Sequence, residues 1–254
     1  WVCKSNYYFY KSLQINVMRK YYFTITSILV LVICLASCSK EETKTQNNTA
    51  SRPIVPILDR TVTDVDGNIY KIVTIGNKKW TKTNLNVSHY RNGDPIPQVT
   101  DPTQWGNLTT GAWCYYNNDS ANGPIYGKLY NWYAINDPRG LAPIGYHVQS
   151  EEEWTSLITF LGGISIAGGK LKAMALWNSP NTGATNSSSF TGLPGGCRNT
   201  NGEFSYIGSY GFWWCSNEYD TTYAPYYFIS CINIDVNGGG SVKSPGFSVR
   251  CIKD

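Results

Sequence analysis

The sequence has few charged residues, few histidines and no Cys-x-x-Cys pair. Charged side chains account for 15% of its 254 residues, and it contains only two histidines and two methionines. Zinc sites are built from closely spaced Cys and His residues, and no Cys-x-x-Cys pair occurs to supply one. The chain also has no heptad, no Gly-x-y period and no repeat of the length that solenoids use, which excludes fibrous and repeat architectures.

The net charge of +4 belongs to the N-terminal end of the chain. Residues 1–37 contain four basic residues and no acidic one, so residues 38–254 carry 17 basic and 17 acidic side chains. Binding to nucleic acid depends on Lys and Arg side chains that neutralise phosphates. This neutral remainder gives no electrostatic reason to expect a nucleic acid as a partner.

Aromatic residues and glycines are abundant instead. The chain has 19 Tyr, 9 Trp and 24 Gly, and hydrophobic residues make up 42% of it, which is too much for a disordered protein. Tyr and Trp are enriched in strands. The length fits one large domain or two small ones, and the composition predicts a turn-rich β or α+β protein.

Residues 18–38 have the form of a bacterial lipoprotein signal. A short basic start at residues 18–20 is followed by an apolar stretch over 25–35, and small residues at 36–37 precede Cys38. The apolar stretch is too short for an ordinary membrane-spanning helix. We expect Cys38 to be acylated and to become the new N-terminus; a plain signal peptide with an accidental cysteine is the alternative.

The segments around this signal complete the expected organisation. Residues 1–17 carry no targeting pattern and are interpreted as an upstream extension of the coding sequence. The lipidated cysteine and a flexible tether are expected over 38–58, and one folded domain over 59–254. The protein would then be exported and held on a membrane through Cys38, at the outer membrane or cell surface of a Gram-negative bacterium.

The first part of the folded region reads as a β-hairpin. Hydrophobic and polar residues alternate over 69–75, and residues 76–77, Gly-Asn, form a two-residue turn before the return strand. Residues 64–68 have the composition of a turn and lack the distal Glu of a calcium-binding loop. Residues 91–125 are rich in Gly, Pro, Asn and Asp, and they predict long, ordered loops that are held by scattered aromatic side chains.

Residues 150–163 carry the clearest helix pattern. Ser150 can cap the helix while Glu153 closes a capping box, and the glycines at 162–163 end it. The positions expected to be buried follow a helical spacing: Trp154, Leu157, Ile158 and Leu161. A second, shorter helix is expected from about residue 169 to residue 176.

The pattern returns to strands after Phe190. Alternation over 227–236 predicts one strand, the glycines at 238–240 are expected to turn the chain, and residues 247–251 predict a terminal strand. The expected fold class is therefore α+β, with small antiparallel sheets, one or two helices and extensive ordered loops.

Several short stretches occur in a fixed order along the folded region. They are 64–70 (DVDGNIY), 75–80 (IGNKKW), 127–133 (GKLYNWY), 140–147 (GLAPIGYH), 192–196 (GLPGG), 210–214 (YGFWW) and 246–251 (GFSVRC). In this order they resemble the Fibrobacter succinogenes major paralogous domain, a family of exported, often lipidated proteins that is common in Bacteroidetes. The resemblance implies a C-type-lectin-like fold, which is shared by formylglycine-generating enzymes and by variable receptors diversified by retroelements.

Three positions depart from the pattern of that family. Val148 stands where members often have Pro, and Cys215 stands where they often have Ser. Some members have a cysteine where this chain has Ala142, so a disulfide from that position to Cys251 cannot form.

No residue pattern predicts catalysis, a metal or a cofactor. His147 precedes the capped helix, where we expect its imidazole to bond to the backbone rather than act as a general base. No Gly-x-Ser-x-Gly elbow is present. Formylglycine-generating enzymes hold copper through two cysteines five positions apart, whereas successive cysteines from Cys197 to Cys251 are 16 to 20 positions apart. The Glu-Pro-Asn and Gln-Pro-Asp motifs of calcium-dependent lectins are also absent.

The folded region contains an odd number of cysteines, so at least one thiol is unpaired unless it joins another chain. One or two structural disulfides are expected, with a pairing that the sequence does not define. The five candidates are Cys114, Cys197, Cys215, Cys231 and Cys251.

The C-terminal third predicts a contact surface. Residues 205–236 combine many aromatic side chains with small polar ones, as adaptable recognition surfaces do, although at least one of Trp213 and Trp214 is expected in the core. The candidate ligand-binding residues are Trp214, Tyr219, Tyr223, Tyr226, Tyr227 and Asn233. We interpret the protein as a non-enzymatic binding or adhesion module for a protein or glycan ligand. The alternatives are a formylglycine-generating oxidoreductase, a retroelement-diversified receptor and a structural component of the envelope.

Overall fold

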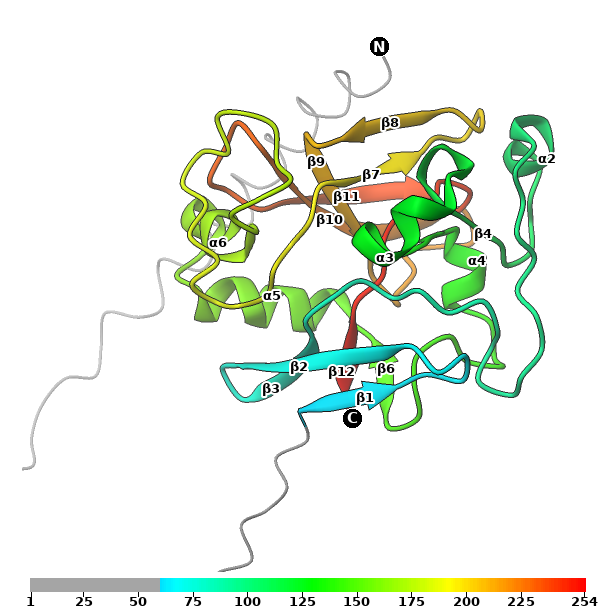
Figure 1. Ribbon diagram of the computed structural model, residues 1–254, viewed down its shortest axis with the longest axis horizontal. Helices are drawn as coiled ribbons and strands as arrows, with labels where there is room; N and C mark the ends of the chain where they lie inside the picture. Colours follow the sequence, from blue (N-terminus) through cyan, green and yellow to red (C-terminus); the bar gives the residue numbers. More distant parts are fainter. Residues whose placement is uncertain (1–59) are drawn as a thin grey trace, which may run out of the picture. The chain divides into compact units, whose positions relative to one another are not determined.

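The computed structural model describes residues 60–254 (Figure 1). The expected signal peptide, Cys38 and the tether lie outside the described residues. Within the described part, helices combine with antiparallel sheets, which confirms the α+β prediction. No helix in this part is long and apolar enough to cross a bilayer.

The first sheet contains the start and the end of the described chain. Its strand order is β1 (Thr61–Thr63), β2 (Ile69–Ile75), β3 (Lys78–Thr81), β12 (Cys251–Lys253) and β6 (Tyr146–Val148), and neighbouring strands are antiparallel. Ile75 pairs with Lys78, so the predicted two-residue turn of the first hairpin is confirmed. The predicted turn at residues 64–68 is also present, closed by a bond from the Gly67 amide to the Asp64 carbonyl oxygen.

The second sheet is formed by the C-terminal third. Its order is β11 (Asn237–Val242), β10 (Tyr223–Ser230), β9 (Tyr210–Trp214), β7 (Gly195–Arg198) and β8 (Phe204–Ile207). Only the β7–β9 pair is parallel among these neighbours. The expected turn at glycines 238–240 is wrong, because these glycines lie inside β11 and the chain reverses over residues 231–236 instead.

The predicted capped helix is confirmed as α5 (Glu151–Phe160). Both bonds of the capping box between Ser150 and Glu153 are present, and the apolar positions of its stripe are buried. The second helix, α6 (Ile164–Leu171), begins and ends earlier than expected. The helix ends because the backbone of Lys172 is extended. The Lys172 ammonium group bonds to carbonyl oxygens outside the helix, such as that of Asn233.

The remaining elements are short and lie within long loops, as the composition of that region predicts. They are α2 (Pro102–Gly106), β4 (Trp113–Cys114), the 3-10 turns η1 (Tyr116–Asn118) and η2 (Ser120–Asn122), α3 (Gly123–Tyr126), β5 (Leu129–Tyr130) and α4 (Trp132–Ile135). β4 and β5 pair as a small two-stranded sheet.

Trp154 on α5 connects the two large sheets through the core. Its ring centroid lies 6.1 Å from that of Trp80 on β3 and 5.9 Å from that of Trp213 on β9. All three side chains are buried. Edge and tilted contacts of this kind add to the free energy gained from burying the rings, so this cluster fixes how α5 lies between the sheets.

Candidate functional site

The two adjacent tryptophans of β9 are both core residues. Trp213 and Trp214 are 0% exposed, which confirms that at least one lies in the core. The Trp213 indole donates to the Asn84 side chain, and the Trp214 indole donates to the Tyr130 carbonyl oxygen at 3.0 Å. The expectation that Trp214 contacts a ligand is therefore wrong, because its ring is enclosed and its N–H is used inside the protein.

Two of the candidate tyrosines serve mainly to pack the second sheet. Tyr226 and Tyr227 are neighbours on β10 and point to opposite faces. Tyr227 stacks on Trp154 with centroids 5.2 Å apart, while Tyr226 lies 5.1 Å from Phe247 on the other face. Both side chains are half-buried, so only their outer parts are open to contact.

The remaining candidates are exposed but do not form one site. Tyr219 and Tyr223 are 48% and 46% exposed, and the Tyr219 hydroxyl donates to Glu151 at the start of α5. Asn233 lies beyond the other end of β10. A strand of eight residues spans roughly 25 Å, so the structure separates these residues into two groups.

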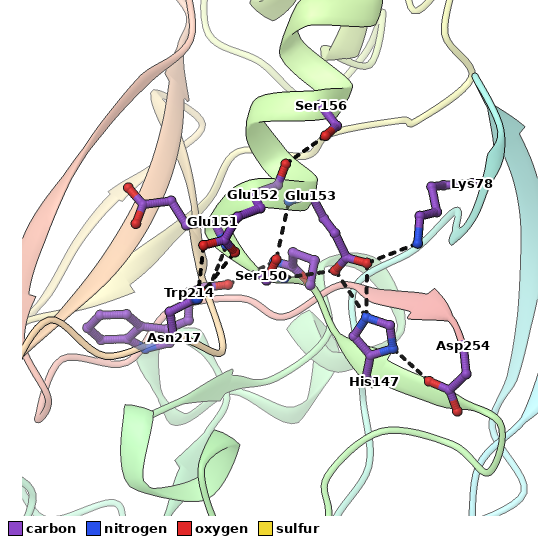
Figure 2. A network of polar contacts seen from close by, with 11 residues as sticks. Lys78, His147, Ser150, Glu151, Glu152, Glu153, Ser156, Trp214, Asn217 and Asp254 are labelled. Carbon is purple, nitrogen blue, oxygen red and sulfur yellow. Dashed lines mark hydrogen bonds and ion pairs between the residues drawn. The ribbon is translucent and has the colours of Figure 1, made fainter. Parts of the chain in front are cut away.

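A polar network surrounds the N-terminus of α5 (Figure 2). His147 is placed between two carboxylates: its Nδ1 lies 2.6 Å from Asp254, and its Nε2 lies 3.0 Å from Glu153. Glu153 also closes the capping box with Ser150 and lies 3.5 Å from Lys78. The expectation of a backbone partner for His147 is wrong, because β6 and β12 bring the imidazole beside side-chain carboxylates. Through the His147 imidazole, this arrangement links the Asp254 carboxylate, which follows β12, to Glu153 in the first turn of α5.

Uncharged segments from three parts of the chain meet at one end of the domain, in the upper left of Figure 1. We define the neutral loop face as residues 162–169, 173–191 and 231–234, which contain no Asp, Glu, Lys or Arg. The segments are joined by backbone bonds such as Gly169 N–H to Ile234 and Thr182 N–H to Cys231. Its apolar side chains that are at least 38% exposed are Ile164, Ile166, Met174, Leu176, Ile232 and Ile234.

The backbone of this face is held in uncommon conformations. Among the eight described non-glycine residues with positive φ, five lie within 173–191. Four of these are Asn, Ser or Thr, but Leu176 has a φ of 73° and is 50% exposed. A bulky residue in the left-handed region costs roughly 1–2 kcal/mol and marks a conformation imposed by its surroundings. The loop therefore presents Leu176 to solvent at an energetic cost.

The side chain of Lys172 holds this face together. Lys172 is 0% exposed, and its ammonium group donates to the carbonyl oxygens of Thr182, Ser230 and Asn233 at 2.6–2.9 Å. Burial lowers the pKa of this ammonium group. An ammonium group has three N–H donors, and each one is satisfied by a backbone carbonyl: two in loops, at Thr182 and Asn233, and one at the last residue of β10, Ser230. The lysine therefore fixes loop 173–191 against the segment that follows β10.

Buried arginines organise other loops in the same way. Arg250 donates to the carbonyl oxygens of Thr81, Phe190 and Thr191, and Arg198 donates to those of Val99 and Thr100. No sequence pattern predicted the roles of these two arginines or of Lys172. Arg250 belongs to the family stretch 246–251, and each of the three cations has at least one apolar neighbour in the sequence, a weak indication of burial.

The five cysteines of the described part form no disulfide with one another. Each of the five is buried and none is bonded to another, so the expectation of one or two disulfides is not met. Cys215 N–H bonds to Pro225 and Cys231 N–H bonds to Ser209, at opposite ends of the β9–β10 ladder. About six strand residues, roughly 20 Å, separate these two cysteines. In residues 60–254, no group of three His, Cys, Asp or Glu residues gathers as a metal site would require.

A small cavity between the turn at 64–68 and the loop before β6 does not form a ligand site. Its volume is about 120 Å³, below the usual range for small-molecule pockets. The polar groups on its wall bond within the protein: Asp64 accepts from Tyr70, and Arg91 donates to the Ala142 and Tyr146 carbonyl oxygens.

The fold and the neutral loop face define an α+β domain with an ordered, uncharged surface of loops. The family model for the Fibrobacter succinogenes major domain matches residues 73–253. The chain belongs to this family, as the order of its short stretches indicates. No curated protein and no solved structure matches the chain, and the relation to the C-type-lectin-like fold stays a prediction.

Proposed function

We propose that this chain is a surface lipoprotein whose domain binds a protein or glycan ligand on the neutral loop face and catalyses no reaction. The observation that carries this proposal is the clamp formed by Lys172, which holds two uncharged loops with a completely buried ammonium group. Loops that are ordered before binding lose less conformational entropy when a ligand arrives.

The chemistry of the face supports recognition of a neutral ligand. Met174 and Ile232 are 66% and 57% exposed, and the segments of the face also contain many Asn, Ser, Thr and Gly residues. Small polar residues supply adaptable hydrogen bonds, and exposed apolar side chains supply contact area. The only partly exposed charges that directly border the segments of the face are those of Lys170 and Asp235, so its chemistry favours sugars or uncharged protein surfaces over ionic ligands.

The geometry of Cys215 and Cys231 supports a role without copper chemistry at these two thiols. Copper(I) needs two soft ligands close together. Cys215 and Cys231 lie at opposite ends of the β9–β10 ladder, so they cannot share one ion. Burial also raises the pKa of the Cys215 thiol, which favours the protonated form over the thiolate that binds metal.

The proposal is tested with residues 39–254 on a glycan array and on a panel of extracellular proteins. The variant Met174→Ser/Ile232→Ser removes the exposed apolar side chains of the face, and we expect at least about a tenfold loss of affinity for whichever probe binds. The matched control is Ile69→Ser/Ile144→Ser, because these isoleucines are 69% and 79% exposed outside the face.

Three results would contradict the proposal. Equal binding by the variant and the wild type would place the ligand elsewhere. Turnover of a small substrate would make the domain an enzyme, and a partner that never dissociates would favour a structural envelope role.

Anchoring at Cys38 is tested separately by labelling cells with an alkyne fatty acid, which we expect to mark the wild type and not Cys38→Ser.

A further inference from the structure

The hairpin of β2 and β3 carries positive charge that the domain does not neutralise. Residues 69–83 contain four lysines and no acidic residue. Among these lysines, Lys71 is exposed, and Lys79 and Lys82 are partly exposed. None of these three forms an ion pair with a carboxylate of the described part. The hairpin therefore offers its cations to a partner outside the domain.

The acidic residues that precede the hairpin are used inside the protein. Asp64 is buried and accepts from the Tyr70 hydroxyl. Asp66 accepts from the Ser88 amide and lies beside the His89 imidazole. Their charges therefore have partners of their own, and the excess of positive charge on the hairpin stays.

Two of the lysines face each other across the strands. The Lys82 amide donates to the Lys71 carbonyl oxygen, next to the Ile72–Thr81 pair, so the two side chains share one face of the sheet. Like charges that lie directly opposite each other destabilise a sheet. A pair of this kind, kept without a carboxylate between its members, fits a surface that meets a negatively charged partner.

The proposed anchoring segment enters the domain beside this pair. β1 is the first strand of the described part, and its first residue, Thr61, pairs with Lys71 (Figure 1). Arg60, directly before it, is exposed and adds a further cation. The chain between Cys38 and Arg60 can extend by at most about 75 Å. An acyl group on Cys38 therefore keeps the hairpin within reach of lipid headgroups.

We propose that the basic hairpin docks on anionic phospholipid headgroups of the membrane that holds the lipid at Cys38. We define the basic hairpin by its cations: Arg60, Lys71, Lys78, Lys79 and Lys82. The inference rests on the anchor in the proposed function, because the anchor makes a membrane the anionic surface within reach. Lys and Arg side chains near an anionic membrane add to the affinity, and this attraction falls off within about 10 Å at 0.1 M salt.

The test measures co-sedimentation of residues 39–254, which include every described residue and carry no lipid. The vesicles contain phosphatidylcholine alone or with about 30% of the anionic phosphatidylglycerol, at about 0.05 and 0.3 M salt. The variant is Lys71→Gln/Lys82→Gln. The matched control, Gln104→Glu/Thr109→Glu, changes the net charge equally at exposed positions on and after α2, an element that lies away from β2 and β3 in Figure 1.

We expect binding to the anionic vesicles only, with weaker binding at the higher salt concentration. The lysine variant should bind at least about tenfold more weakly, and the control should bind as the wild type does. Urea midpoints should show that the lysine variant is at least as stable as the wild type, because the repulsion between like charges is removed.

Equal binding to both kinds of vesicle would overturn the proposal, as would equal binding by the lysine variant or no binding at the lower salt concentration. Transfer of the protein from anionic vesicles to heparin would assign the cations to a soluble polyanion and would overturn it as well. Because the soluble chain has no acyl group, these results test the basic hairpin alone, and the fatty-acid label tests the anchor at Cys38.

Discussion

The ammonium nitrogen of Lys172 lies 2.6 Å from the carbonyl oxygen of Asn233, which is 61 positions further along the chain. This single bond connects the residue after α6 with the segment after β10. It shows how the domain keeps long uncharged loops in one arrangement without a disulfide among the described residues. The buried cation satisfies carbonyl groups that the loops cannot pair by themselves.

Replacing this lysine tests whether it orders the neutral loop face. We expect Lys172→Met to lower the free energy of unfolding by about 2–4 kcal/mol, because buried carbonyls lose their donor while the aliphatic volume is kept. Urea unfolding measures the change. Hydrogen exchange should rise in residues 178–185 and 231–236. The control is Lys170→Met, since Lys170 is half-buried and bonds to only one carbonyl, that of Leu161; an equal loss in both variants would contradict the role of Lys172.

The capping box of α5 gives a second prediction. The Ser150 side chain accepts from the Glu153 amide, and the Glu153 carboxylate accepts from the Ser150 amide (Figure 2). Ser150→Ala should lower the free energy of unfolding by about 1 kcal/mol. Ser156→Ala should change it little, because that hydroxyl only bonds back to the Glu152 carbonyl oxygen within the helix. Thermal unfolding of the two variants, measured side by side, tests this difference in stability. A larger loss of stability in Ser156→Ala than in Ser150→Ala would contradict the role of the capping box.

The domain should lose stability at alkaline pH. Burial raises the pKa of Cys114 and of Tyr90 to about 12, and it raises the pKa of Cys251 and Tyr70 as well. For an acid with a raised folded pKa, the stabilisation is complete below the unfolded pKa and is lost as pH rises through the folded value. Three cations act in the opposite direction, because burial lowers the pKa of Lys128 to about 8, that of Arg250 to about 9 and that of Lys172 as well. They are outnumbered, since burial also raises the pKa of Cys215 and of four more tyrosines: Tyr116, Tyr126, Tyr130 and Tyr227.

Urea midpoints at pH values from about 8 to 11 should therefore fall steadily above about pH 9. Cys114→Ala removes one of the buried acids and should make the decline shallower while the fold is retained. A midpoint that stays constant, or a Cys114→Ala slope equal to that of the wild type, would show that these groups do not ionise on unfolding.

The state of the cysteines is a fourth prediction. In residues 39–254, purified without reductant, we expect the five thiols to react with a thiol reagent in urea and to be protected in the native protein, because all five are buried. Fewer than five reactive thiols in urea would reveal a disulfide. Cys231→Ser serves as the control and should lower the count by one.

Local patterns were sufficient for the elements whose stabilising contacts lie close in sequence. The hairpin at β2–β3 follows from a two-residue Gly-Asn turn, and α5 follows from its cap and apolar spacing. The same reasoning failed at glycines 238–240, because rings from β10 take the place of the missing side chains. It also failed for Trp214, whose partner Tyr130 lies 84 positions away.

By itself, the sequence determined the α+β class, the membership of a family with its ordered stretches, and the presence of a folded region rich in aromatic residues. Only the tertiary structure decided which aromatic side chains are buried, which cysteines stay apart, and which uncharged loops meet at one end. The physical reason is distance along the chain. Buried cations such as Lys172 and Arg250 bond to carbonyl groups about 10 to 170 positions away, and no local pattern records such partners.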